Sequence, residues 1–168
     1  MRIPVFVSAP TALNDEQAAS YAIVLEELAN LQLEPRRLGV SDYPRDYPLR
    51  EVAVIARHCS GGIILGFEQF RSQAAVWKHG SASERTVTEL VRLPTPWNHL
   101  EAGILFGLKL PLLIFREPGI AGGVFDEGVT DVFVNKMPMH GQSPEERRAL
   151  TEIFLKWRGR VSEHYSTL

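Results

Sequence analysis

The amino-acid sequence predicts a three-layer α/β fold, in which one doubly wound sheet of five parallel strands lies between two layers of helices. Short apolar runs of strand length alternate along the chain with segments whose apolar residues recur at helical spacing. Such alternation is typical of a parallel sheet that is covered on both faces. With 168 residues, 45% hydrophobic and 23% charged, the chain suits a single domain, residues 1–168, with one sizeable core.

The expected elements follow one another in a regular order. The expected strands are residues 3–8, 35–40, 61–67, 111–117 and 131–135. The expected helices are residues 14–31, 49–58, 95–108 and 143–161. Three helix starts carry capping signals, namely Asn14 with Gln17, Thr95 with Pro96, and Ser143 with Glu146. Five strands in such a sheet favour the flavodoxin-like order 2-1-3-4-5.

Residues 68–96 interrupt this order. The periodic pattern fails there for about thirty residues, and a connection of this length in a compact domain is more often functional than idle. We therefore expect an insertion at about 68–96. Its charged central part fits a solvated loop, and a lid is the alternative.

Composition excludes several classes of function. The formal net charge of −2 and the pI near 6.2 give no electrostatic footprint for nucleic acid, and no apolar run is long enough to span a bilayer. Cys59 is the only cysteine, which favours a reducing, cytoplasmic setting. The histidines show no metal-ligand spacing with one another or with Cys59, so we expect no metal site.

Glu101 is an ionisable residue near the start of an otherwise apolar helix, in the stretch PTPWNHLEAG. A buried carboxylate is costly unless it is paired or used. Open parallel sheets bind ligands at the carboxyl ends of the strands, where the strand order reverses, here between strands one and three. The helix with Glu101 starts at this edge, and Trp97 shares its face. The sequence predicts a carboxylate and an indole at a ligand crevice, although such a glutamate also complements a helix dipole.

Residues 97–101, W-N-H-L-E, resemble the W-C-x-x-E element of Toll/interleukin-1 receptor (TIR) domains, whose glutamate is catalytic in the NAD-cleaving members. The segment LEAGILFGLKLPLLI, residues 100–114, resembles nucleoside 2-deoxyribosyltransferases, in which a glutamate attacks the anomeric carbon. Glu101 occupies that place. The resemblance covers residues 3–11 and 61–115. Asn98 replaces the cysteine common in TIR domains, and the insertion is longer than either family suggests.

Both families act on a bond between a base and a sugar. The resemblance therefore implies an enzyme that cleaves, or transfers across, the N-glycosidic bond of a nucleotide, with an NAD glycohydrolase-type activity first and Glu101 as the catalytic carboxylate. It implies a small-molecule nucleotide as ligand, no required cofactor, NAD as the substrate, and self-association or a partner protein. The alternatives are a non-catalytic nucleotide-sensing or scaffold module, and a deoxyribosyltransferase or nucleoside hydrolase. A nicotinamide dehydrogenase is disfavoured because the glycine fingerprint is missing.

The resemblance also implies a set of substrate-binding residues around Glu101. They are Ser8, Pro10, Thr11, Phe67, Glu68, Trp97 and Asn98. The two aromatic residues are expected to stack on the base or on nicotinamide, and Glu68 or Asn98 to hold ribose hydroxyls. Ser8 and Thr11 are expected to lie where phosphate meets backbone N–H groups.

Each of these residues also has a plainer interpretation. Trp97 is then a plug over the helix start, Phe67 belongs to the core, and Ser8 and Thr11 are turn residues. The residues of the loop after the second strand either border the pocket or form a plain turn, namely Asp42, Tyr43, Asp46 and Tyr47.

Overall fold

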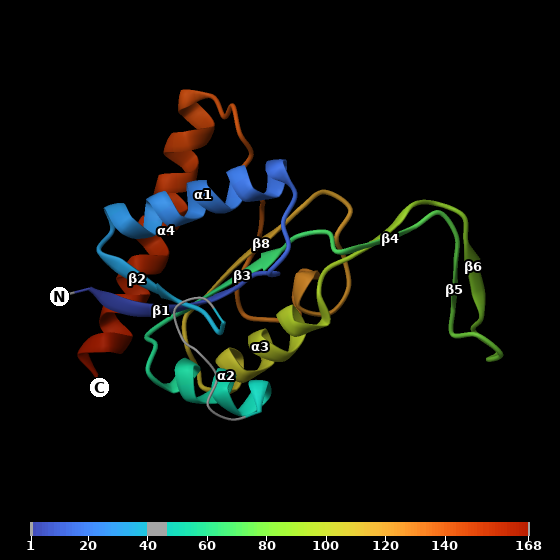
Figure 1. Ribbon diagram of the computed structural model, residues 1–168, viewed down its shortest axis with the longest axis horizontal. Helices are drawn as coiled ribbons and strands as arrows, with labels where there is room; N and C mark the ends of the chain where they lie inside the picture. The colour runs from blue at the N-terminus through green and yellow to red at the C-terminus, as the bar shows by residue number, and fades with distance from the viewer. Residues whose placement is uncertain (1, 40–46, 168) are drawn as a thin grey trace.

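A computed structural model describes residues 2–39 and 47–167 and has the predicted three-layer α/β fold (Figure 1). Five parallel strands form one sheet in the order β2-β1-β3-β8-β9, which confirms the flavodoxin-like order. The strands are β1 (Ile3–Ser8), β2 (Leu33–Arg36), β3 (Gly62–Gly66), β8 (Leu112–Arg116) and β9 (Val134–Lys136). The helices are α1 (Asp15–Asn30), α2 (Pro48–Arg57), α3 (Pro96–Gly107), α4 (Pro144–Ser166) and the short 3₁₀ helix η1 (Gly123–Phe125).

Helices cover both faces of the sheet, and each face has its own apolar core. In Figure 1, α1 and α4 lie on one face and α2 and α3 on the other. Side chains alternate along β3, so that Ile63 and Leu65 pack under α1 and α4, whereas Ile64 packs under α2 and α3. The apolar runs of the central strands are therefore buried on both sides, as expected for parallel strands.

The predicted capping signals are present at three helix starts. The Asn14 side chain accepts a hydrogen bond from the backbone N–H of Gln17 at 2.9 Å, and Gln17 accepts one in return. Ser143 and Glu146 form the same reciprocal pair at the start of α4. At α3, Thr95 accepts from the backbone N–H of Trp97 at 3.3 Å. These pairs satisfy backbone donors that have no partner within the helix.

Two strand predictions are shifted along the chain. The second strand is Leu33–Arg36 rather than residues 35–40, because Gln32 has a φ of 58° and turns the chain directly from α1 into the sheet. Its pairing with β1 starts at Ile3 opposite Leu33. The fifth strand is Val134–Lys136 rather than residues 131–135, because its pairing with β8 starts only at Val134 opposite Ile114.

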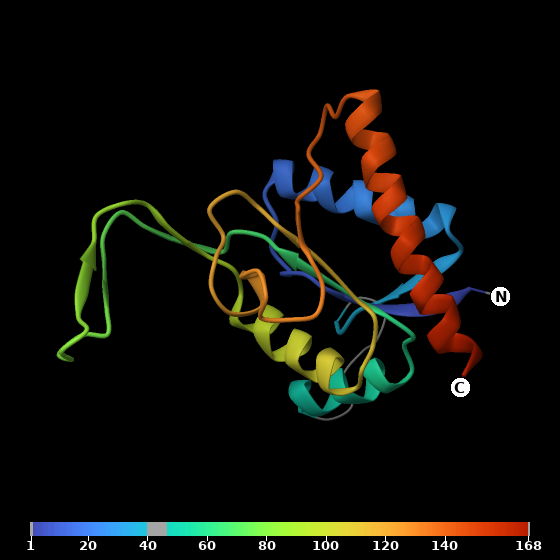
Figure 2. The same ribbon diagram turned by 180° about the vertical axis from the view of Figure 1, so that it is seen from behind.

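The insertion is an arm of two antiparallel ribbons rather than the expected irregular loop. At its root β4 (Phe70–Ser72) pairs with β7 (Val91–Leu93), and farther out β5 (Ala75–Trp77) pairs with β6 (Arg85–Val87). We call residues 70–93 the arm. Figures 1 and 2 show it extending away from the rest of the molecule. Among the described residues, no helix combines the length and the apolar character that crossing a membrane requires.

Candidate functional site

A pocket of about 240 Å³ lies at the carboxyl edge of the sheet. The loops that follow β1, β2 and β3 form its walls together with the first turns of α2 and α3. Its lining residues are Val7, Ala9, Pro10, Thr11, Arg37, Leu38, Pro48, Gln69, Thr95, Trp97 and Glu101. This is the edge at which open parallel sheets bind ligands. Glu101, Trp97, Pro10 and Thr11 therefore line one pocket, whereas their roles in catalysis and binding stay predictions.

Glu101 is held against the sheet by the helix that carries it. Ala102 and Leu105 are buried and pack α3 onto the core, which draws the neighbouring carboxyl group out of bulk water. Burial raises the pKa of Glu101 to about 7, and this effect outweighs the opposing effects of a hydrogen bond with Ser8 and the positive charge of Arg37. At neutral pH the group is therefore close to its midpoint.

Ser8 and Asn98 are bound to each other rather than exposed to the pocket. Asn98 follows the helical spacing of Ala102 and Leu105 and is fully buried. Its Nδ2 donates to Ser8 Oγ at 2.8 Å and to the Ser8 carbonyl oxygen at 3.4 Å. Because Ser8 Oγ accepts from Asn98, its own hydrogen is left to donate to the carboxylate of Glu101.

This arrangement corrects the prediction for Asn98 and gives the Ser8 side chain a different partner. The buried amide of Asn98 does not line the pocket, so it is not placed to hold a ribose hydroxyl. The Ser8 side chain is buried as well and serves Glu101. The prediction for Asn98 was wrong because sequence spacing places it at the correct edge but does not show that it binds Ser8. The predicted phosphate contact through the backbone N–H groups near Ser8 stays a prediction.

Trp97 lies one helical turn before Glu101 and borders the same pocket. Its side chain is 41% exposed, so part of the indole remains accessible beside the carboxyl group. Thr95 caps the helix through the backbone N–H of Trp97 and also lines the pocket. The N-terminus of α3 thus supplies an aromatic surface, a hydroxyl and a carboxyl group to one cavity.

Arg37 was missed by the sequence analysis although it shapes the pocket. Its Nη2 donates to the carbonyl oxygen of Ala9 at 2.8 Å and to that of Pro10, and its guanidinium lies over the Tyr21 ring, 5.6 Å from the centroid. These contacts tie the end of β2 to the loop after β1. The predicted strand of residues 35–40 contained Arg37, so the sequence did not indicate that this residue follows the strand at the ligand-binding edge.

Phe67 lies outside the pocket, and the prediction that it stacks on a base is wrong. Its side chain is fully buried in the core under α1 and α4. The reason is alternation along β3, which puts Phe67 on the same face as Ile63 and Leu65, whereas the pocket opens on the face of α3. The plainer interpretation, a core residue, applies.

Glu68 anchors the arm instead of lining the pocket. Its carboxylate accepts from Arg71 Nε at 2.5 Å and Nη2 at 3.1 Å, and Arg92 Nε lies 3.4 Å away. The hydrogen bond from Arg71 lowers the pKa of Glu68. The next residue, Gln69, lines the pocket and donates to the Ala12 carbonyl oxygen at 3.2 Å. The expected role of Glu68 in holding hydroxyls is therefore corrected.

Glu117, at the end of β8, is a second residue that the sequence analysis missed. Its Oε2 accepts from the backbone N–H of Glu68 at 2.5 Å and from Gln17 Nε2 at 3.0 Å. The carboxylate thereby joins the ends of β3 and β8 to the start of α1 and holds together the segments from which the pocket loops extend.

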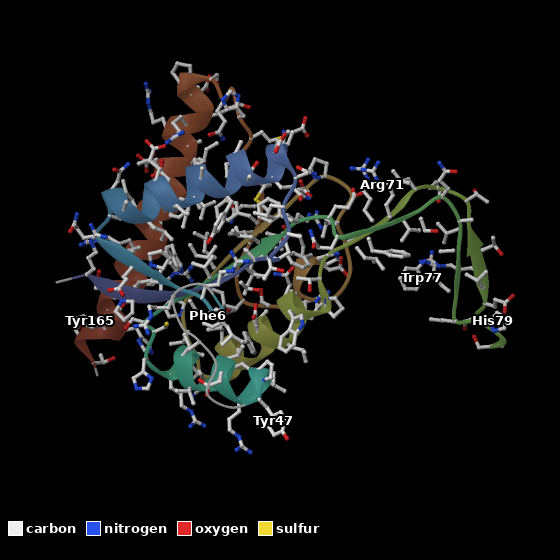
Figure 3. All side chains as sticks on the ribbon, viewed as in Figure 1. Phe6, Tyr47, Arg71, Trp77, His79 and Tyr165 are labelled. Carbon is white, nitrogen blue, oxygen red and sulfur yellow. The ribbon has the colours of Figure 1, made fainter. Side chains whose placement is uncertain are left out.

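Two further predictions concern the loop after β2 and a metal site. Tyr47 is exposed at the start of α2 (Figure 3), whereas Asp42, Tyr43 and Asp46 lie outside the described residues. Within residues 2–39 and 47–167, no group of three or more His, Cys, Asp or Glu side chains is arranged to hold a metal ion.

No protein-family model matches this chain, and a comparison with curated proteins finds no match either. The assignment of a function therefore rests on the chemistry and geometry of the pocket.

Proposed function

We propose that the protein cleaves the N-glycosidic bond of a nucleotide, with NAD as the first candidate substrate and Glu101 as the catalytic carboxylate. One observation carries the proposal: a partly buried carboxyl group and an accessible indole share a pocket at the ligand-binding edge of the sheet. Clefts that combine apolar walls with few polar groups and a perturbed pKa are typical of catalytic sites.

The chemistry of the reaction suits a single carboxylate. When the bond between the ribose carbon and the base nitrogen breaks, the electron pair leaves with the base and positive charge develops on the sugar. An ionised Glu101 beneath the anomeric carbon would stabilise that charge or trap it as an ester, and water would then supply the hydroxyl group and release a proton. The dry surroundings of Glu101 strengthen this attraction.

The leaving group favours NAD over a neutral nucleoside. Nicotinamide departs as a neutral molecule and needs no general acid, whereas a neutral nucleobase requires a proton donor. Ser8 donates to the Glu101 carboxylate and so favours the ionised form. Burial still raises the pKa of Glu101 to about 7, so the anion forms at neutral pH and above.

The pocket is small for a whole dinucleotide. Its volume of about 240 Å³ lies below the range of roughly 300–1,000 Å³ that is usual for drug-sized ligands. We infer that it takes the ribose and the attached base, and that the remainder of the nucleotide lies outside. Stacking of the base on Trp97 would contribute on the order of 1–3 kcal/mol.

Product analysis with NAD and a panel of nucleosides tests the proposal. We expect the wild-type protein to release nicotinamide, and Glu101→Gln to lower the rate at least about a hundredfold, since it removes the charge that faces the transition state. Glu152→Gln, an exposed change on α4, is the matched control and should leave the rate unchanged. Equal turnover by Glu101→Gln would contradict the assignment, and turnover of nucleosides alone would favour a nucleoside hydrolase or deoxyribosyltransferase.

A non-catalytic nucleotide sensor is the second candidate, because four of the expected ligand-binding residues have side chains that are occupied elsewhere. Ser8 and Asn98 bind each other, Phe67 is part of the core, and Glu68 binds Arg71. Fewer polar groups then remain to orient a sugar for reaction. Calorimetry with NAD, followed by analysis of the recovered nucleotide, separates the candidates, because a sensor binds the nucleotide and returns it intact.

A further inference from the structure

The arm is a long segment that contributes nothing to the core. None of its residues, from Phe70 to Leu93, is buried. Four of its large apolar side chains are well exposed to solvent, namely Phe70, Val76, Trp77 and Leu90. Two-stranded ribbons are marginally stable on their own in water, and each arm strand has only three residues. The apolar part of the arm is therefore available to a second surface.

The root of the arm is fixed, so that the arm extends in a defined direction. Glu68 binds Arg71 on one side of the root and faces Arg92 on the other, and Arg92 Nη1 donates to the Pro118 carbonyl oxygen at 3.3 Å. Figure 3 places Arg71 near the root and Trp77 and His79 on the distal part, away from the sheet and its helices. These contacts set the direction in which the arm leaves the sheet.

The charge of the arm is opposite to that of the rest of the chain. The arm carries four basic residues, Arg71, Lys78, Arg85 and Arg92, against two acidic ones, Glu84 and Glu89. Since the whole chain has 18 basic and 20 acidic residues, the remainder has 14 basic and 18 acidic residues. The arm thus has a formal charge of +2 and the remainder one of −4.

Residues 126–133, which we call the acidic loop, complement the arm in charge and also expose apolar side chains. The loop contains three acidic residues, Asp126, Glu127 and Asp131, and no basic one. Two of its apolar side chains are exposed: Phe133 is 85% exposed, and Val129 is exposed as well. Apolar groups surrounded by negative charge complement apolar groups surrounded by positive charge.

We propose that the arm of one copy docks on the acidic loop of a second copy, so that the protein associates with itself. The arm spans residues 70–93, a length close to the roughly 20–30 residues that each partner contributes to a standard interface. Nucleic acid is the other polyanion that attracts a basic ribbon, but the charge of −4 on the remainder of the chain opposes its approach. A second copy has a formal net charge of only −2, so this repulsion is far weaker for it than for a nucleic acid.

Removal of the distal arm tests the proposal without disturbing the core. Ser72 and Val91 are opposite each other in the β4–β7 ribbon, so residues 73–90 can be replaced by Asn-Gly, the preferred two-residue hairpin turn. In sedimentation measurements over a concentration series, we expect the average molecular mass of the wild-type protein to increase with concentration. The truncated protein should remain a monomer. Circular dichroism should show an unchanged fold. A monomeric wild type, or a truncated protein that still associates, would overturn the proposal.

Side-chain changes test where the arm docks. We expect Trp77→Ser to weaken association about thirtyfold or more, as is usual for a buried interface tryptophan. Leu155→Ser changes an equally accessible site on α4 and should have no effect on association. Arg85→Glu and Asp131→Arg should each weaken association about tenfold, and their combination in one chain should restore it to within about threefold. A double variant as weak as the single ones would exclude the acidic loop as the docking surface.

Fluorescence polarisation with a labelled DNA duplex distinguishes the nucleic-acid alternative. We expect no binding that depends on residues 73–90. A wild-type protein that stays monomeric but binds the duplex through the arm would replace the proposed partner with nucleic acid.

Discussion

Glu101 affects the stability of the folded protein as well as the chemistry of the pocket. Its pKa is about 7 in the folded chain and 4.5 as the reference value. Between these two pH values the folded state keeps a proton that the unfolded chain has lost, so the free energy of unfolding falls as the pH rises through this interval. The loss is complete above pH 7 and amounts to about 3 kcal/mol.

Glu101→Gln should therefore stabilise the protein in a pH-dependent manner. Because the amide carries no charge, the variant and the wild type should have the same free energy of unfolding near pH 4.5. Above pH 7 that of the variant should be higher by up to about 3 kcal/mol. Chemical denaturation at about pH 5 and about pH 8 measures the difference. Glu152→Gln is the control with no pH-dependent gain, and the same gain at both pH values for Glu101→Gln would contradict the burial of the carboxyl group.

The residues of the pocket differ in how far the sequence alone identifies them. Glu101 and Trp97 are predictable, because helical spacing and the rule for ligand sites in parallel sheets place them together. Arg37 and Gln69 reach the pocket from loops, whose course no periodic pattern fixes. Phe67 was assigned to the wrong face, although alternation along its own strand separates it from the pocket.

At the scale of the element, the start of α3 is the part of the fold on which the pocket most depends. Thr95 caps this helix and lines the pocket beside Trp97. We expect Thr95→Ala to lower the free energy of unfolding by about 1 kcal/mol, since a backbone donor loses its partner, and Thr95→Ser to preserve most of it. Thermal unfolding measures both, and equal losses in the two variants would show that the hydroxyl group does not stabilise the helix.

The helices were easier to predict than the arm for a physical reason. The capping pairs at Asn14, Thr95 and Ser143 act over two or three residues, so the local sequence contains them entirely. The arm strands are three residues long, and neither of their faces is buried, so they lack the apolar alternation that identifies a strand. The pairing of Phe70 with Leu93 closes a loop that no local signal indicates.

For the molecule as a whole, the proposed activity and the stability depend on Glu101 in opposite directions. Burial beside the sheet disfavours the ionised carboxylate, but cleavage of the glycosidic bond requires it. The folded state therefore loses stability over the same pH interval in which Glu101 becomes the ionised catalytic group. Such an opposition is common where an active site holds an unfavourable charge in place.

This opposition predicts the form of the pH–rate profile. We expect kcat/KM for NAD to rise with pH through an apparent pKa of about 7 and to level off above about pH 8, since the free enzyme must hold Glu101 as the anion. In Ser8→Ala the carboxylate loses a hydrogen bond that favours its charged form, so the midpoint should move to higher pH by about one pH unit. Ser83→Ala, an exposed change on the arm, should leave the midpoint of the pH–rate profile unchanged. A rate that falls as the pH rises would mean that the protonated carboxyl group is the active form, and Glu101 would then act as an acid toward the leaving base.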